Sequence, residues 1–377
     1  MGILIFPYDP ARMTDMLSGA HCSRNFSIRQ AREIVKDLFV PNAAIYWSDF
    51  LLSIGLGAIC FQIVRQATPF TAAQAIAYVV SCLAFYRAAL FIHELVHLRS
   101  GTFGAFRVTW NLLCGIPFFM PSFLYHTHVA HHARKHYGTR EDGEYLPLGA
   151  GPRRDILLYL CQPFVIPLLA IVRFAIFTPI AWISPGFRRF VHERASSMVM
   201  DPGYVRPLPT TRELRLWRLQ EAACFLYAVG AAVLLFRGRL PWSLPLQGYL
   251  TALGVIMLNH VRTLGAHRFR HQGEALSFVD QLLDSVNYPN HPLIAGLWGP
   301  VGLRFHALHH LFPSLPYHSL AKAHCRLMAQ LPTDSPYRQT VCPSLRHALV
   351  ELWCGARAAN ASVQSSRAAG NVPHPTN

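Results

Sequence analysis

The chain has 377 residues, of which 52% are hydrophobic and only 14% carry a charge. This composition and the positive mean hydropathy are unusual for a soluble protein, so a membrane protein is the expected class. The formal net charge of +15 would suit a nucleic-acid partner, but the Lys and Arg residues lie between apolar runs and form no single basic face. No nucleic-acid partner is therefore expected, and the distribution matches the positive-inside pattern of membrane proteins.

The N-terminal segment, residues 1–43, is expected to be cytosolic or interfacial. Ser27-Ile28-Arg29-Gln30 matches a capping box, and the apolar residues after it fall on one face of a helix. Two interpretations of this helix stay open. It lies on the membrane interface, or it packs on the protein's own surface.

Four apolar runs are long enough to cross the ~30 Å hydrocarbon layer as helices. The first two, residues 45–64 and 72–92, are joined by a short link that contains Pro69 and predict a helical hairpin. A second hairpin is predicted from residues 217–236 and 242–259. The expected fold is an all-α membrane protein with two transmembrane hairpins, interfacial helices and a cytosolic helical cap.

Residues 103–124 and 157–183 are also largely apolar, but prolines interrupt both runs. Because proline breaks the hydrogen bonding of a helix, a full crossing and a shallow dip both stay open for these segments. If neither crosses, the segments after each hairpin lie on one side, which carries most of the arginine and is predicted to be cytoplasmic. Residues 44–325 are then the membrane domain, and residues 326–377 are a C-terminal extension that is predicted to be disordered from about 357.

Histidine is the most informative residue type in this chain, because its 20 copies exceed the 19 Asp and Glu residues together. Three short motifs concentrate it, one after the second apolar run, one near residue 130 and one near residue 308. Histidines three or four positions apart on a helix point the same way, so each motif offers several imidazoles as metal ligands. Eight imidazoles exceed what one ion coordinates, so two metal ions are predicted. These eight residues are His93, His97, His128, His131, His132, His306, His309 and His310.

The first motif has a competing interpretation, because His93-Glu94-Leu95-Val96-His97 also matches the zinc metalloprotease pattern. A protease needs only one further ligand, however, and has no use for two more histidine motifs. Soluble carboxylate-bridged di-iron proteins need paired E-x-x-H motifs, and only Glu94 with His97 has that spacing. Glu94 is therefore expected to accept a hydrogen bond from a metal ligand or to be an interfacial polar residue, without a role as a base.

The three motifs with apolar hairpins before and between them resemble the membrane fatty acid desaturase family over about residues 45–325. This resemblance implies a mostly helical membrane fold, two non-haem iron ions, molecular oxygen as co-substrate and a bound acyl chain. The family usually supplies a ninth histidine from the end of the segment before the third motif. His267 is the expected ninth ligand, with His260 as the alternative.

Other polar residues near the motifs have less certain roles. Asp142-Gly143-Glu144 either accepts the second N–H of ligand histidines or forms a solvated turn. His126 is expected to point away from the metals, whereas His136 is placed where it can approach them. Surface positions are predicted for His318, His324, His347 and His374.

The ending His309-His310-Leu311-Phe312-Pro313 is similar to the third motif of acyl-lipid desaturases and favours desaturation of an acyl-CoA or membrane lipid. Hydroxylation or ketolation of lipids or carotenoids is the alternative, because the same ligands serve both reactions. With no haem, flavin or ferredoxin motif in the sequence, we expect a separate electron donor of the ferredoxin or cytochrome b5 type. A metal transporter is disfavoured, because its histidines should lie inside the spans.

Overall fold

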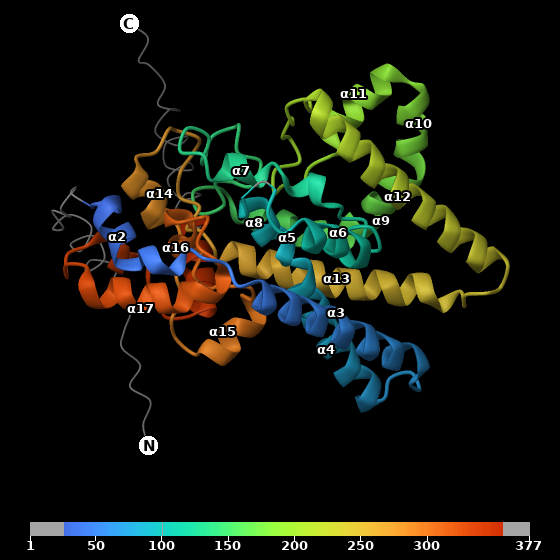
Figure 1. The fold of residues 1–377 in the computed structure, drawn as a ribbon, viewed down its shortest axis with the longest axis horizontal. Coiled ribbons are helices and arrows are strands. Elements are labelled where there is room, and N and C mark those ends of the chain that lie inside the picture. Colours follow the sequence, from blue (N-terminus) through green and yellow to red (C-terminus); the bar gives the residue numbers. More distant parts are fainter. Residues whose placement is uncertain (1–25, 100, 357–377) are drawn as a thin grey trace, which may run out of the picture.

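The computed structural model describes residues 26–99 and 101–356 (Figure 1). The predicted disorder from about residue 357 and the character of residues 1–25 lie outside this part of the chain. Helices account for the regular structure of the described residues, and the only β contacts among them are isolated bridges. The predicted all-α fold is confirmed.

Helix α2 (Ile28–Val35) begins after Ser27, whose hydroxyl accepts a hydrogen bond from the Gln30 N–H at 3.2 Å, as the capping box predicted. The buried side of α2 packs against α17 (Leu320–Gln330). Arg326 of α17 reinforces this contact by bonding both carboxylate oxygens of Asp37. The structure therefore supports the second interpretation, in which this helix packs on the protein's own surface.

The first predicted hairpin consists of α3 (Ala43–Gln66) and α4 (Ala72–Ala89), which pack along each other. Their close approach depends on Gly57, because a side chain there would meet the Phe85 ring at 2.5 Å. An ion pair between Arg87 and Asp49 also joins the two helices. After α4 the chain continues into α5 (Phe91–His97), which carries the first histidine motif.

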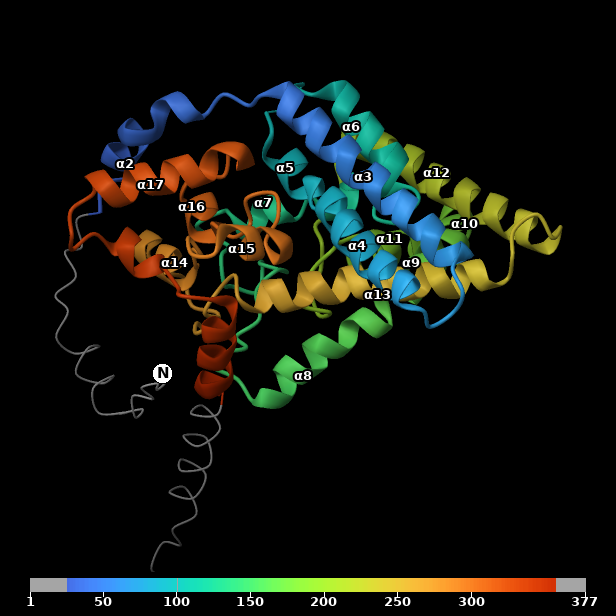
Figure 2. The ribbon, with the colours of Figure 1, turned by 90° about the horizontal axis from the view of Figure 1, so that it is seen from below.

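The second predicted hairpin differs from the expectation. Helices α12 (Thr211–Phe236) and α13 (Ser243–Leu264) follow each other, but α13 packs along α4 and diverges from α12 (Figures 1 and 2). Gly254 makes this packing possible, since a side chain there would meet the Tyr78 hydroxyl and the Cys82 sulfur at 2.8 Å. A hydrogen bond of 2.8 Å from the Tyr78 hydroxyl to the Leu250 carbonyl fixes the contact.

Four stretches of the described chain are long and apolar enough to cross a membrane, namely Ala43–Gln66, Ala72–His97, Ile166–Ile183 and Thr211–Phe236. Three of them match predicted spans, but α13 is not among them, because Gln247, Asn259, His260 and Arg262 make it more polar. The fourth candidate span is instead Ile166–Ile183, for which the sequence left both a full crossing and a shallow dip open. It joins α9 (Ile166–Ile171), a π-helical turn (Val172–Phe177) and α10 (Thr178–Ile183).

The prolines of this stretch stand in the first turns of α9 and α10, where a missing N–H breaks no bond within the same helix. Residues 103–124, also left open, contain α6 (Gly104–Trp110) and short turns instead of one long helix.

The shorter helices position the remaining histidine motifs. They are α7 (His128–His131), α8 (Arg153–Cys161), α11 (Pro185–Arg194), α14 (Phe278–Asp284), α15 (Pro292–Trp298) and α16 (His306–Leu311). In both views α2, α14, α16 and α17 gather at one end of the molecule, which we call the cap, and the links α3–α4 and α12–α13 lie at the other end (Figures 1 and 2). Helix α17 runs through residue 325, so the cap includes residues beyond the predicted domain boundary.

Candidate metal centre

The nine predicted ligands come together in two groups, in each of which the potential ligand atoms lie within 4.8 Å of one another. Helices α5, α7 and α16 and the residue His267, which follows α13, supply them. The first group is His93, His97, His128, His132 and His309, and the second group is His131, His267, His306 and His310.

Helical geometry explains why two motifs divide between the groups. In the second motif, His128 and His132 are four positions apart and enter the first group, whereas His131 enters the second. Adjacent residues are turned by about 100° around a helix, so His131 and His132 point toward different groups. The third motif is divided similarly, with His309 in the first group and its neighbours in the second. The nine histidines were expected to bind two ions together, but their division into these two groups was not predicted.

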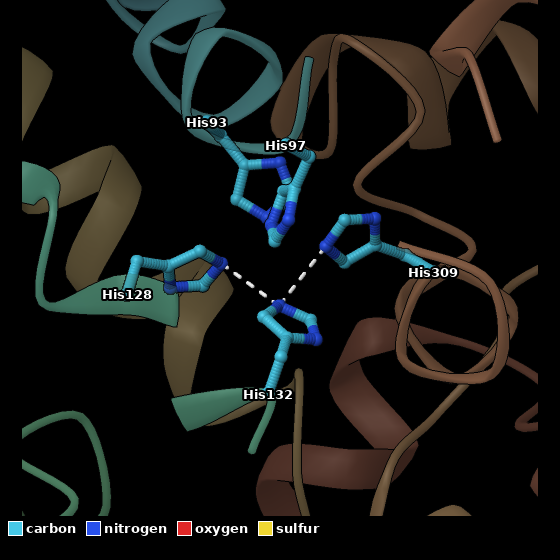
Figure 3. A group of neighbouring side chains, drawn as sticks. All are labelled: His93, His97, His128, His132 and His309. Atoms are coloured by element: carbon cyan, nitrogen blue, oxygen red, sulfur yellow. Dashed lines mark hydrogen bonds between the residues drawn. The ribbon is translucent and has the colours of Figure 1, made fainter. Parts of the chain in front are cut away.

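In the first group the imidazoles point toward one another from three segments of the chain (Figure 3). The Nε2 atom of His132 lies 2.9 Å from Nε2 of His128 and 3.1 Å from Nε2 of His309. The rings of His93 and His97 complete the group, with centroids 4.2 and 4.6 Å from the His309 ring. Five nitrogen donors therefore surround one small volume.

The second group converges in the same way. The Nε2 atom of His267 lies 2.8 Å from Nε2 of His306 and 3.2 Å from Nε2 of His131. His310 closes the group, with its Nε2 atom 3.1 Å from that of His306. Its four nitrogens match the number of ligands that a tetrahedral or partly open metal site requires.

The unsatisfied nitrogens show that these residues fit metal ions. Both ring nitrogens of His93 and the Nε2 atom of His97 are buried without a hydrogen-bond partner. A buried polar atom left unpaired costs roughly 1–3 kcal/mol, and a metal ion bound to these nitrogens would remove that cost. An all-imidazole set suits iron, zinc and copper rather than magnesium or calcium.

Burial keeps most of these imidazole rings in the neutral form that binds a metal ion. Burial lowers the pKa of His128, His132, His306 and His309 well below its ordinary value. The rings are therefore neutral near pH 7, and each has a nitrogen lone pair for a metal. His131 differs, because burial lowers its pKa but the facing Asp142 carboxylate outweighs burial and raises it.

Two carboxylates orient the ligands of the second motif. Asp142 accepts from Nδ1 of His131 and Glu144 accepts from Nδ1 of His128, each at 2.8 Å. Both acidic side chains are largely buried, with exposed fractions of 0% and 16%. The prediction that this segment contacts ligand histidines is confirmed, and the alternative of a solvated turn is wrong. Such contacts select the tautomer that leaves Nε2 free for a metal.

A third orienting contact was missed by the sequence analysis. The Tyr137 hydroxyl donates to Asp284 at 2.8 Å and lies 2.8 Å from Nδ1 of His267. Because Asp284 takes the hydroxyl proton, Nδ1–H of His267 donates to the Tyr137 oxygen, and Nε2 faces the other imidazoles. No sequence spacing signals this contact, since Asp284 reaches His267 only through the antiparallel bridge between His267 and Ser285.

The alternative ninth ligand lies outside both groups. His260 stacks on the Tyr159 ring with centroids 4.4 Å apart, and its Nδ1 atom lies 3.0 Å from the Ile256 carbonyl. His136 is also outside the groups and faces Glu141. His126 is exposed, as expected.

The prediction of a surface position for His324 is wrong. Its side chain is buried, and its Nδ1 atom pairs with the Tyr337 hydroxyl at 2.8 Å. His347 is exposed, as predicted, and His318 is partly buried where its Nε2 accepts from the Asn42 N–H at 3.1 Å. His374 lies outside the described residues.

Glu94 is buried, and among the described residues it accepts no hydrogen bond from a histidine of either group, so the expected contact to a metal ligand is not found. Its Oε2 atom accepts from the Tyr46 hydroxyl and, at 3.2 Å, from the backbone N–H of Tyr317. A carboxylate held in this way is not placed to activate water at a metal. The geometry therefore disfavours the metalloprotease interpretation of the first motif.

Comparison with known proteins agrees with this geometry. The model of the fatty acid desaturase family matches residues 67–341. A ceramide hydroxylase of Caulobacter vibrioides is 39% identical over 341 residues, which cover 90% of this chain and 97% of the relative. No solved structure gives a significant match.

Proposed function

The chain belongs to the fatty acid desaturase family, and we propose that it is an oxidoreductase that hydroxylates a ceramide-class membrane lipid with molecular oxygen. The observation that carries this proposal is the similarity to a ceramide hydroxylase along nearly the whole of both chains. The sequence analysis favoured desaturation and kept hydroxylation as the alternative. The relative supports the alternative better, and desaturation of an acyl chain becomes the second candidate.

The proposed cofactor is a pair of non-haem iron ions, which supply the activation of oxygen toward an unactivated C–H bond. One ion would be held by the five histidines of the first group and the other by the four of the second. Asp142, Glu144 and Tyr137 hold the Nδ1 atoms of three of these rings, which would leave their Nε2 atoms to hold the ions. Burial of most of the rings excludes bulk water from the reacting region.

The partners and the orientation are also proposals. We place the cap and both histidine groups on the cytoplasmic side, following the arginine distribution of the sequence. A separate donor of the ferredoxin or cytochrome b5 type would supply electrons there. The net charge of +15 favours an acidic donor, because opposite charges accelerate encounter.

Lipid analysis of a host that makes ceramides tests the proposal directly. Expression of the chain should add one oxygen atom to ceramide, and the added oxygen should carry the label when the culture grows under heavy-isotope oxygen gas. A product that has lost two hydrogen atoms without gaining oxygen would instead establish desaturation. The variant His309→Ala serves as the control and should give neither product.

A further inference from the structure

A small pocket between α4, α15 and the loop before α16 has the chemistry of a phosphate site. It encloses about 160 Å³ and is lined by Arg87 of α4, Arg304, Tyr317 and the loop from Gly299 to Gly302. Among the described residues no carboxylate and none of the nine histidines lines it directly, although Asp49 accepts hydrogen bonds from two lining residues, Arg87 and Tyr317. The pocket is therefore distinct from the two metal groups and suits an anion.

Within residues 26–99 and 101–356, both arginines keep donors that bond no protein acceptor. Asp49 accepts from Nε and Nη2 of Arg87, which leaves Nη1. Arg304 uses only Nη1, for the carbonyls of Tyr288 and Pro289, and its guanidinium group lies over the Phe305 ring at 4.2 Å. Two guanidinium groups with free donors form the arrangement that binds phosphate oxygens strongly.

The loop that completes the pocket has an unusual backbone. Val301 and Gly302 have φ values of 52° and 73°, in the left-handed region. For a β-branched residue such as Val301 this conformation is a genuine outlier, and the surrounding packing must hold it. Backbone conformations of this kind are common in loops that bind ligands.

The helix beside the pocket indicates where the anion comes from. Three large apolar side chains of α15 face outward, with exposed fractions of 86% for Leu293, 63% for Ile294 and 55% for Leu297. The same helix ends against a candidate span, because the Tyr86 hydroxyl of α4 donates to the Trp298 carbonyl at 3.1 Å. The end of α15 therefore contacts a candidate membrane helix, and lipid at such a place covers exposed apolar groups.

We propose that this pocket binds the phosphate of an anionic phospholipid whose acyl chains cover Leu293, Ile294 and Leu297. The bound lipid would hold the loop that leads directly into α16 and the third histidine motif. A ceramide carries no phosphate, so this lipid is a structural lipid of the bilayer and not the proposed substrate. The proposed lipid site can therefore be tested independently of the proposed reaction.

Native mass spectrometry of the delipidated, detergent-purified chain with phosphatidylglycerol tests the site. Arg304→Gln should weaken retention of phosphatidylglycerol by roughly tenfold or more, because it removes a charge-assisted contact. Arg346→Gln, at an exposed arginine outside the pocket, is the matched control and should retain the lipid. Unchanged retention in Arg304→Gln, with bound metal showing that the variant is folded, would overturn the proposal.

Two further measurements separate a lipid from other anions. Inorganic phosphate should not displace phosphatidylglycerol, and effective displacement would mean a site for free phosphate and contradict the lipid assignment. A nitroxide attached to Leu297→Cys, in a variant whose other accessible cysteines are serine, should collide more often with oxygen than with a water-soluble nickel chelate in phosphatidylglycerol nanodiscs. The reverse preference would place α15 in water and refute the proposal.

Discussion

The substitution Asp142→Asn tests whether the carboxylates beside the histidine motifs control metal binding. Oδ2 of Asp142 accepts from Nδ1 of His131 at 2.8 Å and from the Gly138 N–H at 3.0 Å, while Oδ1 accepts from the Glu144 N–H at 3.0 Å. Asparagine keeps the shape but offers a single oxygen. It therefore loses the negative charge and turns an amide donor toward at least one of these N–H groups.

The expected effect follows from these three contacts. A hydrogen bond to a charged group contributes roughly 1.5–3 kcal/mol, and contacts that orient a metal ligand change metal affinity by about 10–100-fold. We therefore expect Asp142→Asn to lose the ion of the second group about ten times faster than the parent protein during a chelator challenge. Elemental analysis of all transition metals is needed, because imidazole sites bind zinc more tightly than ferrous iron.

Asp201→Asn is the matched control for this experiment. Asp201 also accepts from the backbone of its own turn, at 2.7 Å from the Gly203 N–H, but it contacts no histidine of either group. This variant should keep its metal. Equal metal retention by Asp142→Asn and the parent protein would refute the reasoning, and equal loss in both variants would show that acidic turns in general, rather than the contact to His131, matter.

Three further substitutions give clear expectations. His267→Ala should reduce the metal content from about two ions to one, whereas His260→Ala should leave it unchanged because that ring lies outside both groups. The same loss of metal in both variants would contradict the assignment of His267 as the ninth ligand. Glu221→Ala leaves the buried Arg173 without its carboxylate partner, which should lower the free energy of unfolding by roughly 3–5 kcal/mol. The midpoint of thermal unfolding should therefore fall, and an unchanged midpoint would contradict this expectation. Burial lowers the pKa of His324 to about 4, so the unfolded chain takes up this proton first as the pH falls below about 6.5. The stability that His324 provides above that pH is lost between about pH 6.5 and 4. The variant His324→Gln should therefore show a smaller decrease in the midpoint of thermal unfolding over this pH range, and an equally steep decrease would contradict this expectation.

The features that could be predicted from sequence are those set by short spacings. Histidines four apart on one helix share a direction whatever the surroundings, so the motifs identified, without a tertiary structure, the histidines that gather in the two groups. Asp142 follows His131 by only eleven residues, so a contact between a carboxylate of this segment and a histidine of the motif could also be expected. Long apolar runs likewise identified three of the four stretches able to cross a membrane.

Features that depend on distant parts of the chain were not accessible in this way. The Tyr137 contact to His267 joins residues 130 positions apart, and nothing in the intervening sequence marks it. The path of α13 along α4 depends on the absence of a side chain at Gly254, which faces Tyr78. A burial pattern made by such contacts also explains why His324 was mistaken for a surface residue.

The preference for desaturation over hydroxylation shows the same limit most clearly. It depended on the Leu311-Phe312-Pro313 ending of the third motif, yet both Leu311 and Phe312 are buried in the main hydrophobic core. The Phe312 ring meets Phe39 edge-on at 5.7 Å, on the side where α2 covers the cap. This ending therefore records how the cap packs in this chain. The choice between losing a second hydrogen and gaining oxygen depends on how the substrate carbon lies relative to the two metal groups, and buried packing residues such as Leu311 and Phe312 carry no information about that position.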